Sequence, residues 1–265
     1  MKEPGSDAAN APEGWWVAAS TSGADWSFWL GSGATARPPF AQANTRCLTG
    51  ARGQARDLVG TLSDLLHDHG LSMTDLAGLV VDSGPGSFTS LRMGLATIRA
   101  LGWALRLPVA TVSSLDGMAA RAVLEGMGPR IACVVPARRG SWYVATYAPE
   151  QASDSTDLQA CIASRATVQL SDGDLAPYLT QRLGAQGWTG VGPVPQVLRP
   201  ISMGDPWLDD TAPLACWLAH VAAVRPLWGD AHQAVPLYLA VSEAEVAAAS
   251  VVPDVAGHPI SQLFP

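Results

Sequence analysis

The pattern of apolar and polar positions divides the chain into short strands and helices. Two apolar runs, 15–19 and 26–30, flank the turn-forming stretch STSGAD, and this pattern predicts a β-hairpin. Apolar residues recur at i, i+3, i+4 and i+7 over 52–69, which predicts an amphipathic helix that ends at Gly70. A buried strand is expected next, over 76–81.

The most informative stretch is 80–107, where an apolar strand end is followed by a GPG turn and a long helix. That helix is expected over 89–107 and contains no acid and no lysine. A strand over 109–112 follows, and the S-x-x-D pattern of 113–116 has the form of a capping box at the start of another helix. Alternation of strands and helices implies a layered α/β domain with some parallel pairing.

The second half of the chain has a weaker pattern. Runs at 131–135 and 142–147 again predict a hairpin. We expect a strand at 159–163 and a short helix at 175–183. A clear helix is expected over 213–224, with proline in its first turn.

The helix at 89–107 has two apolar sides, and one sheet can cover only one of them. The bulky side consists of Leu91, Leu95, Ile98, Leu101 and Leu105. The opposite side has smaller residues that allow a neighbouring helix to approach closely: Met93, Ala96, Thr97, Ala100 and Ala104. This second side is covered either by the helix at 52–69 or by a partner protein, and the pattern leaves both open.

The composition of the chain excludes several classes of function. A net charge of -7 and a pI near 5.1 argue against a chain that binds nucleic acid by itself, because such affinity comes mainly from neutralised phosphates. Lys2 is the only lysine. A phosphate-loop lysine, a Schiff-base lysine and a lysine general base are therefore excluded.

The GPG turn is a candidate weak anion site. Backbone N–H groups converge at the start of a helix, and the helix dipole favours negative charge there. The residues concerned are Gly84, Pro85, Gly86, Ser87 and Thr89. However, the third glycine of a dinucleotide fingerprint is missing, and no GK[ST] follows. Such a glycine turn is more often purely structural than an anion site, and here Ser87 or Thr89 would cap the helix.

No pattern of catalytic or metal-binding residues is found. The cysteines are far apart and form no CxxC pair, so we expect reduced core thiols: Cys47, Cys133, Cys161 and Cys216. His67 and His69 point to different sides of a helix, and no H-x-x-x-H or G-x-S-x-G motif occurs. Acids such as Asp82 and Asp116 stand singly and are interpreted as caps or loop residues.

Nothing in the chain resembles a signal peptide or a membrane-spanning segment. We therefore expect a cytoplasmic protein without a membrane partner.

The stretch 84–119, GPGSFTSLRMGLATIRALGWALRLPVATVSSLDGMA, resembles the TsaB family, also called YeaZ, of tRNA threonylcarbamoyladenosine biosynthesis. Weaker likenesses to family motifs occur in PARRGSWYVATY at 136–147 and AVPLYL at 234–239. These three motifs make up about a fifth of the chain, and the order of the expected elements extends the resemblance over most of it.

The resemblance implies the fold of the actin, sugar kinase and Hsp70 superfamily (ASKHA): two lobes with ribonuclease H-like sheets and flanking helices. We expect an N-terminal lobe of 15–110 plus a returning helix at 212–228, and a second lobe of 111–211. Residues 1–14 would be a disordered extension, and 229–265 an extended segment and tail.

The resemblance also implies a non-catalytic scaffold that activates TsaD, the enzyme that transfers a threonylcarbamoyl group to the adenosine beside the tRNA anticodon, with assistance from the ATPase TsaE. Contact with tRNA would be indirect, and homodimers can form through the same surface. No cofactor of its own is expected, although ATP or ADP with magnesium at a junction with the partner stays open. The implied interface residues are Leu58, Leu62, Met93, Ala96, Thr97, Ala100 and Ala104.

The chain departs from the family pattern at several positions. Ser20 and Thr21 stand where an Asp-Thr pair is expected, which removes an acid that related folds place near metal and phosphate. Further departures are Ser90, Pro136, Ser141 and Ala240. The alternatives are a nucleotide-binding ASKHA enzyme (kinase or ATPase), a diverged homodimeric paralogue and a glycoprotease-like peptidase.

Overall fold

A computed structural model describes most of the chain: residues 11–49, 54–138, 140–149, 157–198, 206–209, 212–225 and 227–237. Most of the predicted N-terminal extension and the tail beyond residue 237 therefore lie outside the described residues, as does Ala240.

The first sheet has an antiparallel half and a parallel half. Its strands are β1 Trp15–Ser20, β2 Trp26–Gly31, β3 Thr45–Leu48, β4 Leu76–Asp82, β5 Val109–Val112 and β11 Trp228–Gly229. Their order is β11-β5-β4-β1-β2-β3, in which β1, β2 and β3 are antiparallel neighbours and β4 and β5 run parallel to β1. The predicted hairpin of β1 and β2 is confirmed.

The second sheet repeats this plan. Its strands are β6 Ile131–Pro136, β7 Ser141–Tyr147, β8 Ala166–Ser171, β9 Thr189–Val191 and β10 Trp207–Leu208. Their order is β10-β9-β6-β7-β8, with β6, β7 and β8 antiparallel and β9 and β10 parallel to β6. Apart from β11, which pairs antiparallel with β5, the two sheets thus share one strand order, as the implied pair of ribonuclease H-like sheets requires.

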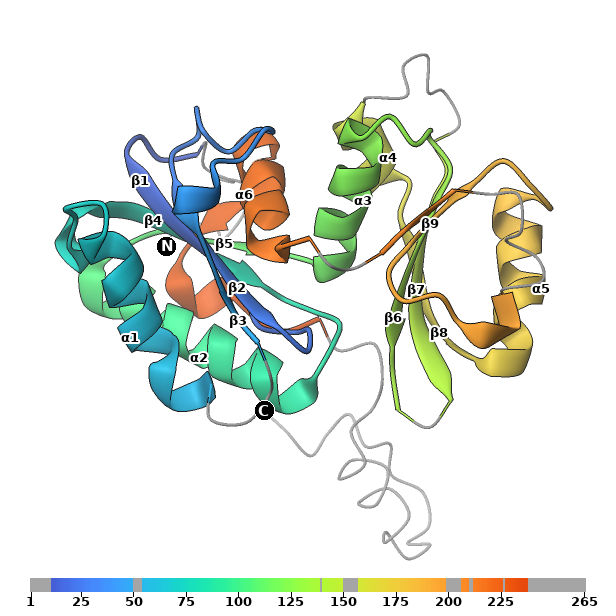
Figure 1. The fold of residues 1–265 in the computed structure, drawn as a ribbon, viewed down its shortest axis with the longest axis horizontal. Coiled ribbons are helices and arrows are strands. Elements are labelled where there is room, and N and C mark those ends of the chain that lie inside the picture. The colour runs from blue at the N-terminus through green and yellow to red at the C-terminus, as the bar shows by residue number, and fades with distance from the viewer. Residues whose placement is uncertain are drawn as a thin grey trace, which may run out of the picture.

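The helices lie on the faces of these sheets and between them (Figure 1). They are α1 Gln54–His67, α2 Phe88–Leu105, α3 Ser114–Leu124, α4 Leu158–Ala163, α5 Asp172–Leu183 and α6 Leu214–Val224. Short 3₁₀ turns occupy Gln42–Asn44, Met73–Asp75, Gln196–Leu198 and Ala231–Gln233. The strand expected at 159–163 is wrong: this segment is α4, because Leu158, Cys161 and Ile162 bury one side of a helical turn that Asp157 caps.

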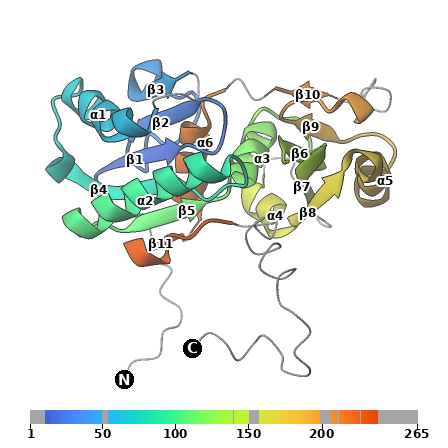
Figure 2. The same ribbon diagram turned by 90° about the horizontal axis from the view of Figure 1, so that it is seen from below.

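Helices α1 and α2 lie side by side on one face of the first sheet, and α6 covers its other face (Figures 1 and 2). Helix α3 follows β5 but packs on β6 of the second sheet and against α6. A single core cluster therefore extends from Trp16 in β1 to Tyr147 in β7. This is the two-lobed α/β architecture that was predicted; the exact domain boundaries stay a prediction.

Asp116 of α3 connects this helix to the second sheet. Its carboxylate accepts hydrogen bonds from the Tyr147 hydroxyl at 3.0 Å and from Nη1 of Arg165 at 2.9 Å. The expected reciprocal capping box is therefore wrong, because only the Ser113 hydroxyl caps the helix, accepting from the N–H of Leu115. Burial raises the pKa of Asp116, and Arg165 acts in the opposite direction.

Close contact with the β1–β2 turn fixes the position of α2. The Thr21 hydroxyl donates to the Ser90 carbonyl at 3.0 Å. A Cβ atom on Gly94 would lie 2.1 Å from Thr21 Oγ1, so only glycine fits at that point of the helix. The turn thus sits directly against the first half of α2.

We expect Arg165→Met to destabilise the fold in a pH-dependent way. The raised pKa means that the folded chain keeps the Asp116 proton at a pH where the unfolded chain has lost it, so this group favours folding less as the pH rises. Removing Arg165 raises the pKa further and takes away the ion-pair partner of the buried carboxylate, which keeps the hydrogen bond from Tyr147. The free energy of unfolding should fall by about 2 kcal/mol at pH 8, a moderate loss because the Arg165 side chain is 30% exposed. The loss should be smaller at pH 5, where Asp116 is protonated to a greater extent and the ion pair contributes less.

Urea unfolding at the two pH values measures this difference, and Arg165→Lys serves as the charge-preserving control. An equal loss at both pH values would contradict the ion-pair explanation.

We expect Gly94→Ala to lower the free energy of unfolding by about 1–2 kcal/mol, because the added methyl group collides with Thr21. In a Thr21→Ala background the same change should cost clearly less, because the two closest atoms of Thr21 are gone and only its Cβ remains, 3.0 Å away. Gly60→Ala in α1 is the matched control: no atom lies within 4 Å of its added Cβ, and it should stabilise the fold by about 0.5–1 kcal/mol. Thermal or urea unfolding would measure all four variants, and a Gly94→Ala effect that is independent of residue 21 would contradict the proposed contact.

Candidate interaction site

The bulky side of α2 faces the first sheet. Leu91, Leu95 and Ile98 are buried there, together with two glycines that allow close packing, Gly94 and Gly102. Leu101 and Leu105 are half-buried. The apolar side with large residues therefore belongs to the core of the chain.

The opposite side of α2 remains largely at the surface. Ala96, Ala100 and Ala104 are exposed, while Met93 and Thr97 are half-buried. Helix α1 lies beside α2 but covers only part of this side (Figure 2). We call the remainder the exposed face of α2; it consists of Phe88, Thr89, Arg92, Ala96, Ala100, Trp103 and Ala104.

Two large aromatic residues on this face were missed by sequence reasoning. Trp103 is 72% exposed and Phe88 is 37% exposed. The helical spacing could have identified Trp103, which lies three residues after Ala100 and seven after Ala96, on the same side of the helix. An exposed tryptophan beside a row of alanines is an unusual surface for a chain without a partner.

The structure corrects the assignment of two residues in α1. Leu58 and Leu62 were expected at an interface, but each is only 1% exposed and is buried among the core side chains between α1 and the sheet. The reason is that the apolar stripe of an amphipathic helix faces the core of its own chain. Among the residues of α1 whose exposure is described, 58–67, Val59 is an apolar residue that is exposed, at 46%.

Arginines border the exposed face of α2 on the side away from α1. The Arg92 guanidinium lies 3.8 Å from the centre of the Phe88 ring, a cation–π contact. Arg99 donates to the carbonyl of His232 at 3.5 Å, which connects α2 to the segment 231–237. Arg106 ends the helix with a left-handed backbone, φ 55°.

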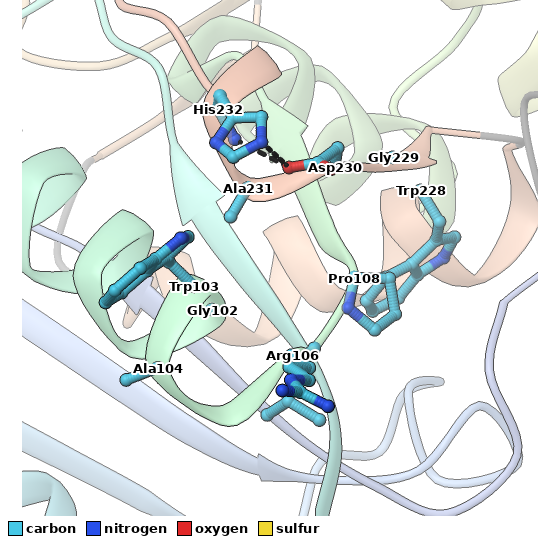
Figure 3. Close-up of a pocket in the computed structure, with 11 residues that line it drawn as sticks. Gly102, Trp103, Ala104, Arg106, Pro108, Trp228, Gly229, Asp230, Ala231 and His232 are labelled. Atoms are coloured by element: carbon cyan, nitrogen blue, oxygen red, sulfur yellow. Dashed lines mark hydrogen bonds and ion pairs between the residues drawn. The ribbon is translucent and has the colours of Figure 1, made fainter.

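An open depression of about 840 Å³ lies at the C-terminal end of α2 (Figure 3). Trp103 and Arg106 line it on the α2 side, and the segment 228–232 lines the other side. Asp230 pairs with the ring of His232 at 3.0 Å within it. Sequence reasoning missed this depression, because its residues come from two distant parts of the chain.

Asp82, at the carboxyl end of β4, is the acid that lies nearest to the GPG turn. It is completely buried and accepts hydrogen bonds from the hydroxyls of Ser20, at 2.9 Å, and Ser22, and from the N–H of Gly84, at 2.7 Å. Burial raises its pKa, and these three hydrogen bonds oppose that shift. Ser20, which stands where the Asp of the expected pair would be, and Ser22 thus hold Asp82, which sequence reasoning had assigned only as a cap or loop residue.

Ser22 fills the space at the GPG turn where an anion would bind. Its carbonyl accepts from the N–H of Ser87 at 2.8 Å, and a Cβ on Gly86 would lie 2.3 Å from that oxygen. The Ser87 side chain donates to Ser90 Oγ instead of capping the helix. The residues present therefore do not fit a nucleotide phosphate in this turn, and Thr89 remains on the surface.

The GPG turn is also tied to the start of α3. The Ser113 hydroxyl donates to the Gly84 carbonyl at 2.9 Å, and the Ser114 hydroxyl donates to the Pro85 carbonyl at 3.0 Å. The arrangement is that of a structural joint between β4, α2 and α3.

The remaining reactive side chains are widely spaced. Burial raises the pKa of Cys161 and of Cys216 to about 12, and Cys133 is also buried, whereas Cys47 is exposed and was wrongly expected in the core. His220 is buried, with Nδ1 2.7 Å from the Ala36 carbonyl. In the described part of the chain, no cluster of three or more His, Cys, Asp or Glu residues could hold a metal ion, and no helix has the length and hydropathy to span a membrane.

Comparison of the sequence with known proteins identifies its relatives. The family model for TsaD, the tRNA N6-adenosine threonylcarbamoyltransferase, matches residues 50–173. The tRNA threonylcarbamoyladenosine biosynthesis protein TsaB of Escherichia coli is 30% identical over 172 residues, which cover 62% of this chain and 73% of that protein. TsaB of Bacillus subtilis is 38% identical over 84 residues, or 31% of this chain and 35% of that protein.

Solved structures agree at the level of fold. YeaZ from Pseudomonas aeruginosa superposes with a TM-score of 0.64 at 23% identity, covering 85% of this chain and all of that one. The predicted two-lobed α/β fold is therefore confirmed, and it is the fold of YeaZ. The chain belongs to the TsaB family, also known as YeaZ, which is named for tRNA threonylcarbamoyladenosine biosynthesis.

Proposed function

We propose that this protein acts in tRNA threonylcarbamoyladenosine biosynthesis as a non-catalytic subunit that binds and activates a TsaD-type threonylcarbamoyltransferase. The observation that carries this proposal is the exposed face of α2, where alanines and an aromatic residue lie at helical spacing on the surface. The family relationship supplies the partner and the reaction.

The chemistry of this face suits a second helix. Ala96 and Ala100 are four residues apart, so a partner helix can approach closely over them, to about 8–10 Å between axes. Trp103 supplies the kind of large aromatic residue that dominates binding energy at interfaces. The proposed contact also includes Met93, Thr97 and Ala104. It no longer includes Leu58 and Leu62, which are buried and pack α1 onto the core.

The partner's contribution follows from relatedness between the two proteins. The TsaD family model matches residues 50–173 of this chain, a range that contains both α1 and α2. TsaD should therefore present counterparts of these helices, and the two α2 helices would pack against each other near a pseudo-twofold axis. The same geometry would let two copies of this chain form a homodimer when TsaD is absent.

The non-catalytic part of the proposal is supported by the state of the GPG turn. Ser22 occupies the place where a phosphate would bind, and Asp82 already accepts three hydrogen bonds from the chain itself. We assign the transfer chemistry to TsaD and ATP hydrolysis to a TsaE-like protein. This chain would contact tRNA only indirectly, through the complex. Any ATP or ADP with magnesium would bind at the junction between this chain and its partner. The complex would act in the cytoplasm.

We expect Ala100→Glu to weaken the complex with the TsaD of the same organism by at least about tenfold. The substitution places a charge at the centre of the proposed helix contact, where it would be buried without a partner. Surface plasmon resonance of the purified proteins would measure the affinity, and threonylcarbamoyladenosine formation on tRNA would measure the consequence.

Ala185→Glu is the matched control, because Ala185 is also exposed but lies in the second lobe. It should leave both measurements unchanged. Unaltered affinity and tRNA modification with Ala100→Glu would exclude α2 as the contact. Separately, tight binding and turnover of magnesium ATP by the isolated wild-type chain would contradict the non-catalytic assignment.

A further inference from the structure

The described chain ends close to the start of the exposed face of α2. The 3₁₀ turn Ala231–Gln233 packs against α2, where Arg99 donates to the His232 carbonyl. The last described residue of the chain, Leu237, donates its N–H to the carbonyl of Ser83 at 2.8 Å. Ser83 directly precedes the GPG turn, so residues 238–265 continue from a point beside the N-terminal end of α2.

The residues after Leu237 are complementary in charge to this helix. They contain three acids and no lysine or arginine: Glu243, Glu245 and Asp254. Helix α2 has the opposite charge: it contains two arginines and no acid, and Arg106 follows as its C-terminal cap. The two arginines within the helix, Arg92 and Arg99, lie on the side of α2 that contacts His232.

Side-chain size matches as well. The stretch LAVSEAEVAAAS, 239–250, is rich in alanine and short branched residues, like the exposed row on α2. The 18 residues of α2 span about 27 Å, and the twelve residues of 239–250 would span about 18 Å as a helix or about 40 Å when extended. This stretch is therefore long enough to lie along most of the exposed face.

We infer that, in the free protein, residues 239–250 dock on the exposed face of α2, with Glu243 and Glu245 beside Arg92 and Arg99. The tail would shield Trp103 and the alanine row from water. A binding partner that uses this face must then displace the tail. That regulatory consequence rests on the proposed function, whereas the docking itself does not.

Photo-cross-linking of the full chain tests the docking without any TsaD. Benzoylphenylalanine at position 100 should cross-link to 239–250 of the same molecule at low protein concentration. Mass spectrometry of a mixture of isotope-labelled and unlabelled protein distinguishes these cross-links from cross-links between two copies. The same probe at Thr180, which is exposed on α5, is the control and should give no such product. Cross-links only to other segments or only between copies would overturn the inference.

Charge reversal tests the predicted pairing and does not require the core to change. Glu243→Arg with Glu245→Arg should lower the cross-link yield at least about threefold at low salt, because two attractive contacts become repulsive. Adding Arg92→Glu and Arg99→Glu should restore the yield. A yield that is unaffected by the first pair, or not restored by the second, would overturn the inference.

Discussion

The contact between α3 and α6 holds the two lobes together. Each of these helices follows a strand of one sheet but packs on the other sheet: α3 on β6, and α6 on β1. The crossing is close because residue 117 is glycine, and a Cβ there would lie 2.9 Å from side-chain atoms of both Leu214 and Leu218. Neither sheet can bury its inner face without a helix from the other half, so we expect the two lobes to fold as one cooperative unit. Since α6 occupies the inner face of the first sheet, α1 and α2 are left to cover the outer face, and there one side of α2 meets solvent.

Much of the local structure could be predicted from the sequence, because the signals are periodic and short. The hairpin of β1 and β2, the amphipathic α1 and the long α2 all follow from the spacing of apolar residues. The shared strand order of the two sheets does not follow from such spacing, since it depends on which distant segments pair, and only the family resemblance implied it. Helix α4 was missed because it is only six residues long, and a short apolar run does not by itself distinguish a helix from a strand.

The candidate site shows the same division. That α2 has a second apolar side follows from its own sequence, and Ala96, Ala100 and Ala104 are exposed as the hypothesis requires. The error at Leu58 and Leu62 arose because periodicity identifies an apolar stripe but not what covers it. The environment of Asp82 was equally hidden, because its hydroxyl partners Ser20 and Ser22 lie about 60 positions earlier in the chain.

The Ser22 carbonyl at the start of α2 has a consequence for how the helix is presented. In a protein whose helix start holds a phosphate, the ligand oxygens accept hydrogen bonds from the backbone N–H groups there. In this chain a main-chain oxygen from the neighbouring turn takes that position, so the protein supplies its own permanent substitute for the ligand. The start of α2 is thereby attached to the β1–β2 turn by contacts within the chain, so folding itself sets the position from which its outer face is presented.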